Sequence, residues 1–306
     1  MPDLHALLPS AGMLRRIEPL PSGAVAAVWD GNGAVPDAGS GATFWVPPFL
    51  AGPAISQAVT SLPELAVVQL MTAGADAFVG RLPGGVTLCD ARGVHTSATS
   101  EWAAAVLLAA ARELPGFVLA QQRREWAFHV TGELAGTRVL VVGAGAIGEG
   151  LRARLLPFDV EVTMVARRAR DGVHSMDDLP DLLPGADAVV VIVPLTDATR
   201  GLVDAAFLRR MKDGALLVNA ARGPVVDTDA LLAELQNGRL RAALDVTDPE
   251  PLPADHPLWL VDGLLLTPHV AGSVRGFPDR AAALITAQLR RFAAGEPLEN
   301  VVSDGY

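Results

Sequence analysis

The chain has 306 residues, half of them hydrophobic, and a formal net charge of −10 at pH 7. This length can bury a large core and exceeds the usual size of a single domain, so we expect two domains. The acidic balance argues against a general nucleic-acid or anionic-membrane partner, although it does not bear on a small anion bound in a locally basic cleft.

The sequence contains one cysteine, Cys89, so no internal disulfide is expected. Because Cys89 lies in an apolar stretch, we interpret it as part of the core rather than as a nucleophile. The first residues lack a basic start followed by an apolar run, and the longest apolar run, 102–111, is far shorter than the roughly 20 residues that cross a bilayer. We therefore expect a soluble, cytoplasmic protein without a membrane partner.

Short β-type runs alternate with helical patterns along the chain, which predicts βα units around mainly parallel sheets. In the first third, no clear strand precedes residue 25, and strands are expected at 25–29, 43–46, 66–71 and 86–89. A longer helix is expected from residue 99 or 100 to about 112, ahead of Pro115-Gly116. This helix is a candidate bridge between two domains.

A second series of strands and helices begins at residue 138. Its expected strands are 138–142, 160–165, 188–193, 215–219, 242–245 and 263–266, and its expected helices are 146–156, 204–211 and 227–237. The last of these helices is well marked, because Asp227 can cap it and Gly238 can end it. A final helix is expected from about 279 to 294, ending at Gly295.

The first strand of the second series leads into a G-x-G-x-x-G sequence that opens a helix, Gly143 to Gly148. In such a turn Gly143 permits the tight bend, Gly145 lets a pyrophosphate approach the backbone, and Gly148 allows close helix–strand packing. A chance match is the alternative in a chain with 30 glycines, but the position between a strand and a helix argues against it. The phosphates of a dinucleotide would bind at the helix N-terminus.

The residues after the next strand indicate which dinucleotide is bound. An NAD site places Asp or Glu about 20 residues after the glycines, whereas an Arg suits the 2′-phosphate of NADP. Residues 166–170 contain three arginines and no acid. A solvated basic loop is the alternative interpretation. The pattern favours NADP bound by Arg167 and Arg168, with NAD as the second choice.

Three segments of the C-terminal half carry candidate catalytic side chains: Arg222, Glu250 and His269. An Arg can bind a carboxylate or polarise a carbonyl, and a His held by a Glu can transfer a proton near neutral pH. Taken singly, each has a structural alternative: a surface arginine, a turn glutamate beside prolines, and a histidine bonded locally. Together they favour the reduction of a 2-oxo acid, and no metal site is predicted.

These motifs, in this order, resemble the D-isomer-specific 2-hydroxyacid dehydrogenases over nearly the whole chain. The matching features are the glycine turn, Val193-Pro194-Leu195-Thr196, the Arg222 and Glu250 segments, and His269 placed 19 residues after Glu250. The resemblance implies an α/β fold of two doubly wound parallel-sheet domains. Residues 1–97 with 273–306 would form a flavodoxin-like substrate-binding domain, and residues 98–272 a Rossmann-type dinucleotide-binding domain. It also implies a homodimer, with the helix near Glu101 and the loop near Trp126 as contacts.

The resemblance also implies a role for each catalytic candidate. His269 would be the general acid that protonates the substrate oxygen, and Glu250 would hold its imidazole and stabilise the protonated form. Arg222 would bind the 2-oxo group and one carboxylate oxygen. Substrate would be bound by Arg222, His269 and the backbone N–H groups of Ala73 and Gly74, although a purely steric turn is the alternative for that last pair.

The cofactor contacts implied by the resemblance extend beyond the glycine turn. Asp245 would accept a hydrogen bond from the nicotinamide carboxamide, with a solvated turn aspartate as the alternative. The full set is Gly143, Gly145, Ala146, Ile147, Gly148, Arg167, Arg168, Val193, Pro194, Thr199, Ala220 and Asp245.

The predicted function is hydride transfer between NADPH or NADH and a small 2-oxo acid, such as glyoxylate or hydroxypyruvate, to give a D-2-hydroxy acid. One alternative is a dinucleotide-sensing binding protein, because some relatives of this fold act mainly as corepressors. Another is a different dehydrogenase class, such as the L-2-hydroxyacid or short-chain enzymes. Those classes typically place the glycine turn near the N-terminus, so its position here argues against them.

Overall fold

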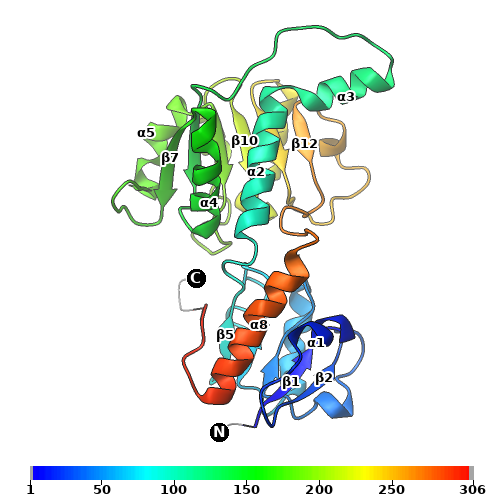
Figure 1. Cartoon of the computed structure of the whole chain (residues 1–306). Helices are drawn as coiled ribbons and strands as arrows, with labels where there is room; N and C mark the ends of the chain where they lie inside the picture. The colour runs from blue at the N-terminus through cyan, green and yellow to red at the C-terminus, as the bar shows by residue number, and fades with distance from the viewer. Residues whose placement is uncertain (1–2, 303–306) are drawn as a thin grey trace. The chain divides into compact units, whose positions relative to one another are not determined.

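The computed structural model describes residues 3–302 and divides the chain into two compact units. Unit 1 comprises the residues up to His95 and those from Arg275 onward, and unit 2 comprises Thr96–Val274. Each unit contains its own parallel sheet (Figure 1). The sequence predicts boundaries at 97/98 and 272/273, and in the structure the chain passes between the units at 95/96 and 274/275.

Unit 1 contains a five-stranded parallel sheet in the order β2-β1-β3-β4-β5, the flavodoxin-like order. Its strands are β1 (His5–Leu8), β2 (Val25–Val28), β3 (Phe44–Trp45), β4 (Val67–Gln69) and β5 (Thr87–Cys89), and its α-helices are α1 (Ala11–Ile17) and α8 (Phe277–Ala294). The four strands expected from the sequence are present, each shortened at one or both ends.

The expectation that no clear strand precedes residue 25 is wrong, because β1 and α1 both lie before it. β1 has the sequence HALL, and alanine and leucine favour helices over strands. The strand forms because it lies between β2 and β3, where Leu7 and Leu8 are fully buried. Burial within the sheet thus outweighs the weak local preference.

α8 completes the core of unit 1. Its buried residues Phe277, Ala281, Ile285 and Leu289 pack with apolar side chains of β1 and α1. The chain after α8 lies antiparallel along β5, where the Val302 N–H donates to the Leu88 carbonyl at 2.9 Å. Cys89, on the same strand, is fully buried, and burial raises the pKa of its thiol to about 12, in agreement with a place in the core.

Unit 2 contains a seven-stranded parallel sheet in the order β12-β11-β10-β9-β6-β7-β8. Its strands are β6 (Arg138–Val142), β7 (Glu161–Ala166), β8 (His174–Ser175), β9 (Ala188–Val191), β10 (Leu216–Asn219), β11 (Arg241–Leu244) and β12 (Leu264–Leu266). Its α-helices are α2 (Thr96–Ala111), α3 (Leu114–Gln122), α4 (Ala146–Leu155), α5 (Leu179–Leu182), α6 (Ala205–Arg210) and α7 (Thr228–Gln236). The strand order reverses beside β6, as in a Rossmann fold.

Both faces of this sheet are buried. β6 contributes Leu140 and Val142 to one core cluster, and Val139 and Val141 to a second. Successive side chains of a strand point to opposite faces, so the two clusters lie on opposite sides of the sheet. The predicted doubly wound, two-sheet α/β fold is therefore confirmed.

The helix ends of unit 2 agree with the sequence at one site and differ at another. Asp227 caps α7 by accepting from the Ala230 N–H at 3.0 Å, as predicted. The helix that was expected to stop before Pro115 is instead followed by a second helix, α3, with Pro115 in its first turn. Proline is tolerated there because the first N–H groups of a helix have no intrahelical partner.

No single helix within residues 3–302 is both long and apolar enough to cross a membrane. α2 and α3 together reach that length and apolarity, but the pair is bent by 65°. In α2, Ala103, Val106 and Leu107 are buried in the core of unit 2, and a core helix can meet the same criteria.

Candidate active site

The glycine turn joins β6 to α4 and is shaped by contacts that only glycine permits. Gly143 has a φ of 123°, and a Cβ there would lie 2.4 Å from the carbonyl oxygen of Ile192. A Cβ on Gly148 would lie 2.1 Å from the carbonyl oxygen of Gly143. The tight bend and the close packing that the sequence motif predicts are therefore both present.

Gly145 lies at the N-cap of α4, and its surroundings are open. No heavy atom of the described chain lies within 4 Å of a Cβ built there, and no described side chain caps this helix end. Ala146 and Ile147 begin the helix, so their N–H groups are among those without an intrahelical partner. This arrangement fits the pyrophosphate of a dinucleotide, which such a helix end binds through backbone N–H groups.

The loop after β7 carries the predicted NADP residues. Arg167 and Arg168 follow the strand directly and are exposed. Arg170 ties this loop to the glycine turn, because its Nη2 donates to the Ala144 carbonyl oxygen at 2.6 Å. The loop that carries the arginines therefore lies beside the glycine turn, the arrangement that a 2′-phosphate site would need. Arg170 was missing from the predicted site residues, and its only signal was the third place in the arginine run.

Four further predicted cofactor residues of unit 2 follow β9, which lies next to β6, and β10, which lies next to β9. Val193 and Pro194 come after β9, and the Thr199 hydroxyl donates to the Pro194 carbonyl oxygen at 2.6 Å. Ala220 comes after β10, and its N–H donates to the Val191 carbonyl oxygen at 3.1 Å. These loops lie at the carboxyl edge of the sheet beside the strand-order reversal, where open α/β sheets bind their ligands.

The catalytic candidates occupy the same edge. Arg222 follows β10, Glu250 follows β11, and His269 follows β12. These three parallel strands are direct neighbours in the sheet, so their carboxyl ends lie side by side. Residues that are 19 to 47 positions apart in the chain are thereby brought to one edge.

His269 and Glu250 are in direct contact. The Nδ1 of His269 and the Oε1 of Glu250 are 2.6 Å apart, and the two side chains are 24% and 40% exposed. With Nδ1–H donating to the carboxylate, Nε2 is the ring nitrogen that can exchange a proton with a substrate. The predicted pairing of these two residues is present.

The Arg222 loop is held against the segment that leads to Glu250. The Asn219 side-chain amide donates to the Arg222 carbonyl oxygen at 3.1 Å, and the Arg222 Nη1 donates to the Ala221 carbonyl oxygen at 2.8 Å. A Cβ on Gly223 would lie 1.9 Å from the Thr247 carbonyl oxygen. Gly223 is a site residue that the sequence analysis missed, because its requirement arises from an approach between distant segments.

Asp245 is buried at the end of β11, with only 3% of its surface exposed, and is not a solvated turn residue. Its Oδ1 accepts from the Thr267 hydroxyl at 2.6 Å and from the Val270 N–H at 2.9 Å. Its Oδ2 accepts from the Ala271 N–H at 2.9 Å. The carboxylate thus contacts the segment that carries His269, and Thr267 is a third residue that the sequence analysis missed, after Arg170 and Gly223.

The two remaining candidates, Ala73 and Gly74, lie in the loop after β4. The Thr72 hydroxyl donates to the Gly74 carbonyl oxygen at 2.7 Å, which shapes this loop. Both belong to unit 1, whereas the glycine turn, the arginines and the catalytic candidates belong to unit 2. Within residues 3–302, no group of three or more His, Cys, Asp or Glu side chains is arranged to hold a metal ion.

The chain resembles known proteins over the whole of this site. The family model "D-isomer specific 2-hydroxyacid dehydrogenase, NAD binding domain" matches residues 104–271. A glyoxylate reductase of Thermofilum pendens is 34% identical over 79% of this chain and 76% of its own length. The chain spans about half the length of two other curated relatives: 56% of an uncharacterised Corynebacterium melassecola protein and 43% of the D-3-phosphoglycerate dehydrogenase of Archaeoglobus fulgidus.

Solved structures match both units. The D-isomer specific 2-hydroxyacid dehydrogenase of Xanthobacter autotrophicus Py2, in complex with NADPH and MES, matches with a TM-score of 0.82 and 31% identity over 98% of both chains. The NADPH-dependent glyoxylate/hydroxypyruvate reductase of Sinorhizobium meliloti, in complex with NADP and sulfate, matches with a TM-score of 0.84 and 25% identity, again over 98% of both chains. These matches confirm the resemblance and the predicted dehydrogenase class: the chain belongs to the D-isomer specific 2-hydroxyacid dehydrogenase family.

Proposed function

We propose that this protein reduces a small 2-oxo acid to a D-2-hydroxy acid with NADPH. The observation that carries the proposal is the 2.6 Å contact between His269 Nδ1 and Glu250 Oε1, on the sheet edge that also carries Arg222. A histidine oriented by a carboxylate is a proton donor that works near neutral pH. An arginine on the same sheet edge supplies the cation that a 2-oxo acid needs.

The proposed chemistry adds one hydride and one proton across the carbonyl group. When bound, NADPH supplies the hydride to the carbonyl carbon. His269 donates the proton from Nε2 to the carbonyl oxygen, and Glu250 stabilises the positive charge that the ring carries before the transfer. Arg222 binds the substrate carboxylate and polarises the carbonyl, which stabilises negative charge as it develops on oxygen. In the reverse direction His269 acts as the base.

The preference for NADPH is supported by the arginine loop. Arg167 and Arg168 are exposed after β7, and the strand is not followed by the carboxylate that would accept from a ribose 2′-hydroxyl. The two structural relatives described above are in complex with NADPH or NADP. For the substrate, the names of relatives that reduce glyoxylate or hydroxypyruvate favour a short acid.

A spectrophotometric screen tests this function. Purified protein is combined with NADPH or NADH and with glyoxylate, hydroxypyruvate, pyruvate, phenylpyruvate or a branched 2-oxo acid. We expect oxidation of NADPH with at least one short acid, and a kcat/KM at least about tenfold higher than with NADH, which corresponds to about 1.4 kcal/mol. Equal use of both cofactors would overturn the NADPH assignment. Tight NADPH binding without any turnover would favour a dinucleotide-sensing binding protein.

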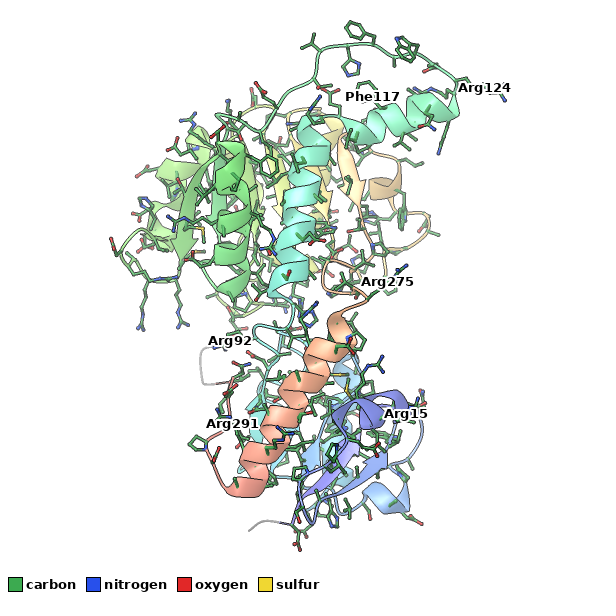
Figure 2. The ribbon with its side chains drawn as sticks, viewed as in Figure 1. Arg15, Arg92, Phe117, Arg124, Arg275 and Arg291 are labelled. Atoms are coloured by element: carbon green, nitrogen blue, oxygen red, sulfur yellow. The ribbon has the colours of Figure 1, made fainter. Side chains whose placement is uncertain are left out.

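We further propose that the protein forms a homodimer through α3 and the loop after it. The two project from the rest of unit 2, with Phe117 on α3 and Arg124 just beyond its end (Figures 1 and 2). The exposed apolar side chains of this projection are Leu114, Val118, Leu119, Trp126, Phe128 and Val130. Trp126 is 96% exposed, and an open pocket of about 510 Å³ lies between it and α3. Apolar groups gathered in this way favour burial by a partner, here a second copy of the chain.

Light scattering after size-exclusion chromatography tests the dimer. The double variant Trp126→Ser/Phe128→Ser should elute as a monomer, whereas the unmodified protein should elute as a dimer. Leu260→Ser is the matched control, because Leu260 is 90% exposed in the same unit but lies outside the projection. If the unmodified protein is monomeric at micromolar concentration, the proposal is contradicted.

We also propose that the protein is located in the cytoplasm. Cys89 is the one cysteine of the sequence and is buried, so the chain forms no internal disulfide, which suits a reducing compartment. The net charge of −10 disfavours nucleic acids and anionic membranes as partners. Fractionation of cells that produce the full chain tests the location, and recovery with the membrane pellet would contradict it.

A further inference from the structure

One residue, Asp245, accepts four hydrogen bonds from the segment that carries His269. Besides the three hydrogen bonds that its carboxylate accepts from Thr267, Val270 and Ala271, the Asp245 backbone carbonyl accepts from the His269 N–H at 2.7 Å. Four donors from a stretch of five residues therefore converge on one buried residue. A carboxylate needed only as a cofactor ligand would not require this arrangement.

The backbone of His269 explains why such bonding is needed. Its φ is +53°, in the left-handed region that side-chain-bearing residues rarely adopt. A residue persists in that conformation only when its surroundings hold it there. Asp245 holds the chain on both sides of the strained residue, through Thr267 before it and through Val270 and Ala271 after it.

The strained backbone in turn sets where the imidazole lies. Glu250 contacts the ring at Nδ1, and Asp245 fixes the chain from which the ring projects. Both residues follow β11, so one strand end positions the ring and its backbone together. The Nδ1 of His269 and the Oε1 of Glu250 are only 2.6 Å apart, so a small shift of the segment would change the position of the ring relative to Glu250.

We propose that Asp245 and Thr267 form a clamp that positions the His269 imidazole for proton transfer. Asp245 is then a positioning residue, beyond the nicotinamide contact that the family resemblance implies. Thr267 is a positioning residue that acts through Asp245. The proposal rests on the proposed role of His269 as the proton donor, but its structural part concerns the ring alone and can be measured without turnover.

The experiment compares three variants of the full-length protein. Thr267→Val removes the hydroxyl donor while keeping the side-chain shape, and Thr267→Ser restores a hydroxyl. Thr163→Val is the matched control, because Thr163 lies half-buried in β7, which is separated from β12 by four strands of the same sheet. The first readout is ¹⁵N NMR of the imidazole nitrogens in cofactor-free protein, with the His269 signals identified by their loss in His269→Gln. The second readout is kcat and KM together with the Kd for NADPH.

In the unmodified protein, His269 should give one set of signals with the proton on Nδ1 in the neutral ring. Thr267→Val should shift or broaden these signals and lower kcat by about tenfold, because small misplacements of a reacting group are costly. Its Kd for NADPH should stay within about twofold. A tenfold rise in this Kd would mean that the variant loses about 1.4 kcal/mol of binding free energy. Thr267→Ser should recover both readouts, and Thr163→Val should match the unmodified protein.

Two results would overturn the clamp. Unchanged His269 signals in a folded Thr267→Val variant would show that the ring does not depend on the clamp. A loss of NADPH affinity as large as the loss of kcat would show that Asp245 serves the cofactor alone. If no 2-oxo acid is reduced by any form of the protein, the proposed function fails, while the NMR comparison still decides whether the clamp holds the ring.

Discussion

The two ends of the unit 2 sheet edge differ in how firmly their functional residues are held. At β11 and β12, His269 is bonded through its ring to Glu250 and through its backbone to Asp245, and Asp245 is buried. At β7, Arg167 and Arg168 are exposed on a short loop that Arg170 ties to the glycine turn by one side-chain hydrogen bond. One end is thus buried and mutually bonded, and the other, which we call the adaptable end, is exposed to solvent.

This difference fits the different tasks that we propose for the two ends. Proton transfer needs a donor placed within a few tenths of an ångström, so the His269 end is built from buried and mutually bonded groups. Recognition of a phosphate tolerates long, solvated cations, because charge attraction acts over several ångströms. Substitutions at the first end should therefore change turnover, and substitutions at the second should change cofactor affinity.

The largest effect is expected from His269→Gln. Loss of the proton donor should lower kcat by about 10²–10⁴-fold, whereas the Kd for NADPH should stay within about twofold because the glycine turn and the arginines are untouched. Stopped-flow reduction of the preferred acid and fluorescence titration of NADPH provide the two numbers. Near-normal turnover would mean that another group donates the proton. The His269 end of the sheet edge would then serve another purpose.

Gly223→Ala should be the next most damaging change. Its Cβ would meet the Thr247 carbonyl oxygen at 1.9 Å, so the Arg222 loop must move away from the segment leading to Glu250. We expect a loss of about 1–3 kcal/mol in stability, visible as a fall of several degrees in Tm, together with lower kcat. Gly84→Ala is the control, since no heavy atom of the described chain lies within 4 Å of a Cβ there. Equal Tm values for the two variants would argue against a rigid His269 end.

The double variant Arg167→Ala/Arg168→Ala tests the adaptable end. The Kd for NADPH should rise by at least about tenfold, and the Kd for NADH should change by less than about twofold, because only NADPH carries the 2′-phosphate. Arg209→Ala removes an exposed positive charge from α6 and serves as the control for general electrostatics. An equal loss for both cofactors would place these arginines outside the 2′-phosphate site.

The smallest effect is expected from Arg170→Ala. It removes the exposed hydrogen bond to the Ala144 carbonyl oxygen, and exposed polar substitutions usually change stability by less than about 0.5 kcal/mol. Tm should therefore hardly move, while the Kd for NADPH should rise by about two- to threefold as the loop becomes less ordered, or about 0.5 kcal/mol. A large fall in Tm would show that the loop is as firmly built as the His269 end, and the contrast between the two would disappear.

Much of the fold could be predicted from the sequence, because unit 2 is built from strongly patterned elements. β6 was expected and is found at 138–142, where a run of valine and leucine meets the glycine turn. β1 could not be predicted, since its alanine and two leucines favour helices and form a strand only when buried between neighbours. α3 was missed because Pro115 ends one pattern and also suits the start of another.

The candidate site also contains residues that could be predicted from the sequence and residues that could not. The spacing of Arg222, Glu250 and His269 indicated their chemistry, and the pairing of Glu250 with His269 is present at 2.6 Å. The roles of Thr267 and Gly223 depend on where loops from neighbouring strands meet. Those contacts are set by side-chain direction and loop shape, which spacing along the chain does not reveal. Sequence therefore indicated which residues we propose to react, and the structure adds which residues hold them.

The place of α8 in unit 1 has a consequence for the order in which the chain becomes structured during synthesis. The core around β1 includes Phe277, Ile285 and Leu289, which the ribosome adds after the whole of unit 2. Unit 2 is one continuous stretch of chain, so its sheet contains no residues that are synthesised later. The first 95 residues, in contrast, can complete their core only after α8 has been synthesised. Nascent chains that end before residue 277 should therefore expose an unfinished apolar surface at their N-terminal part, which is the kind of surface that chaperones bind.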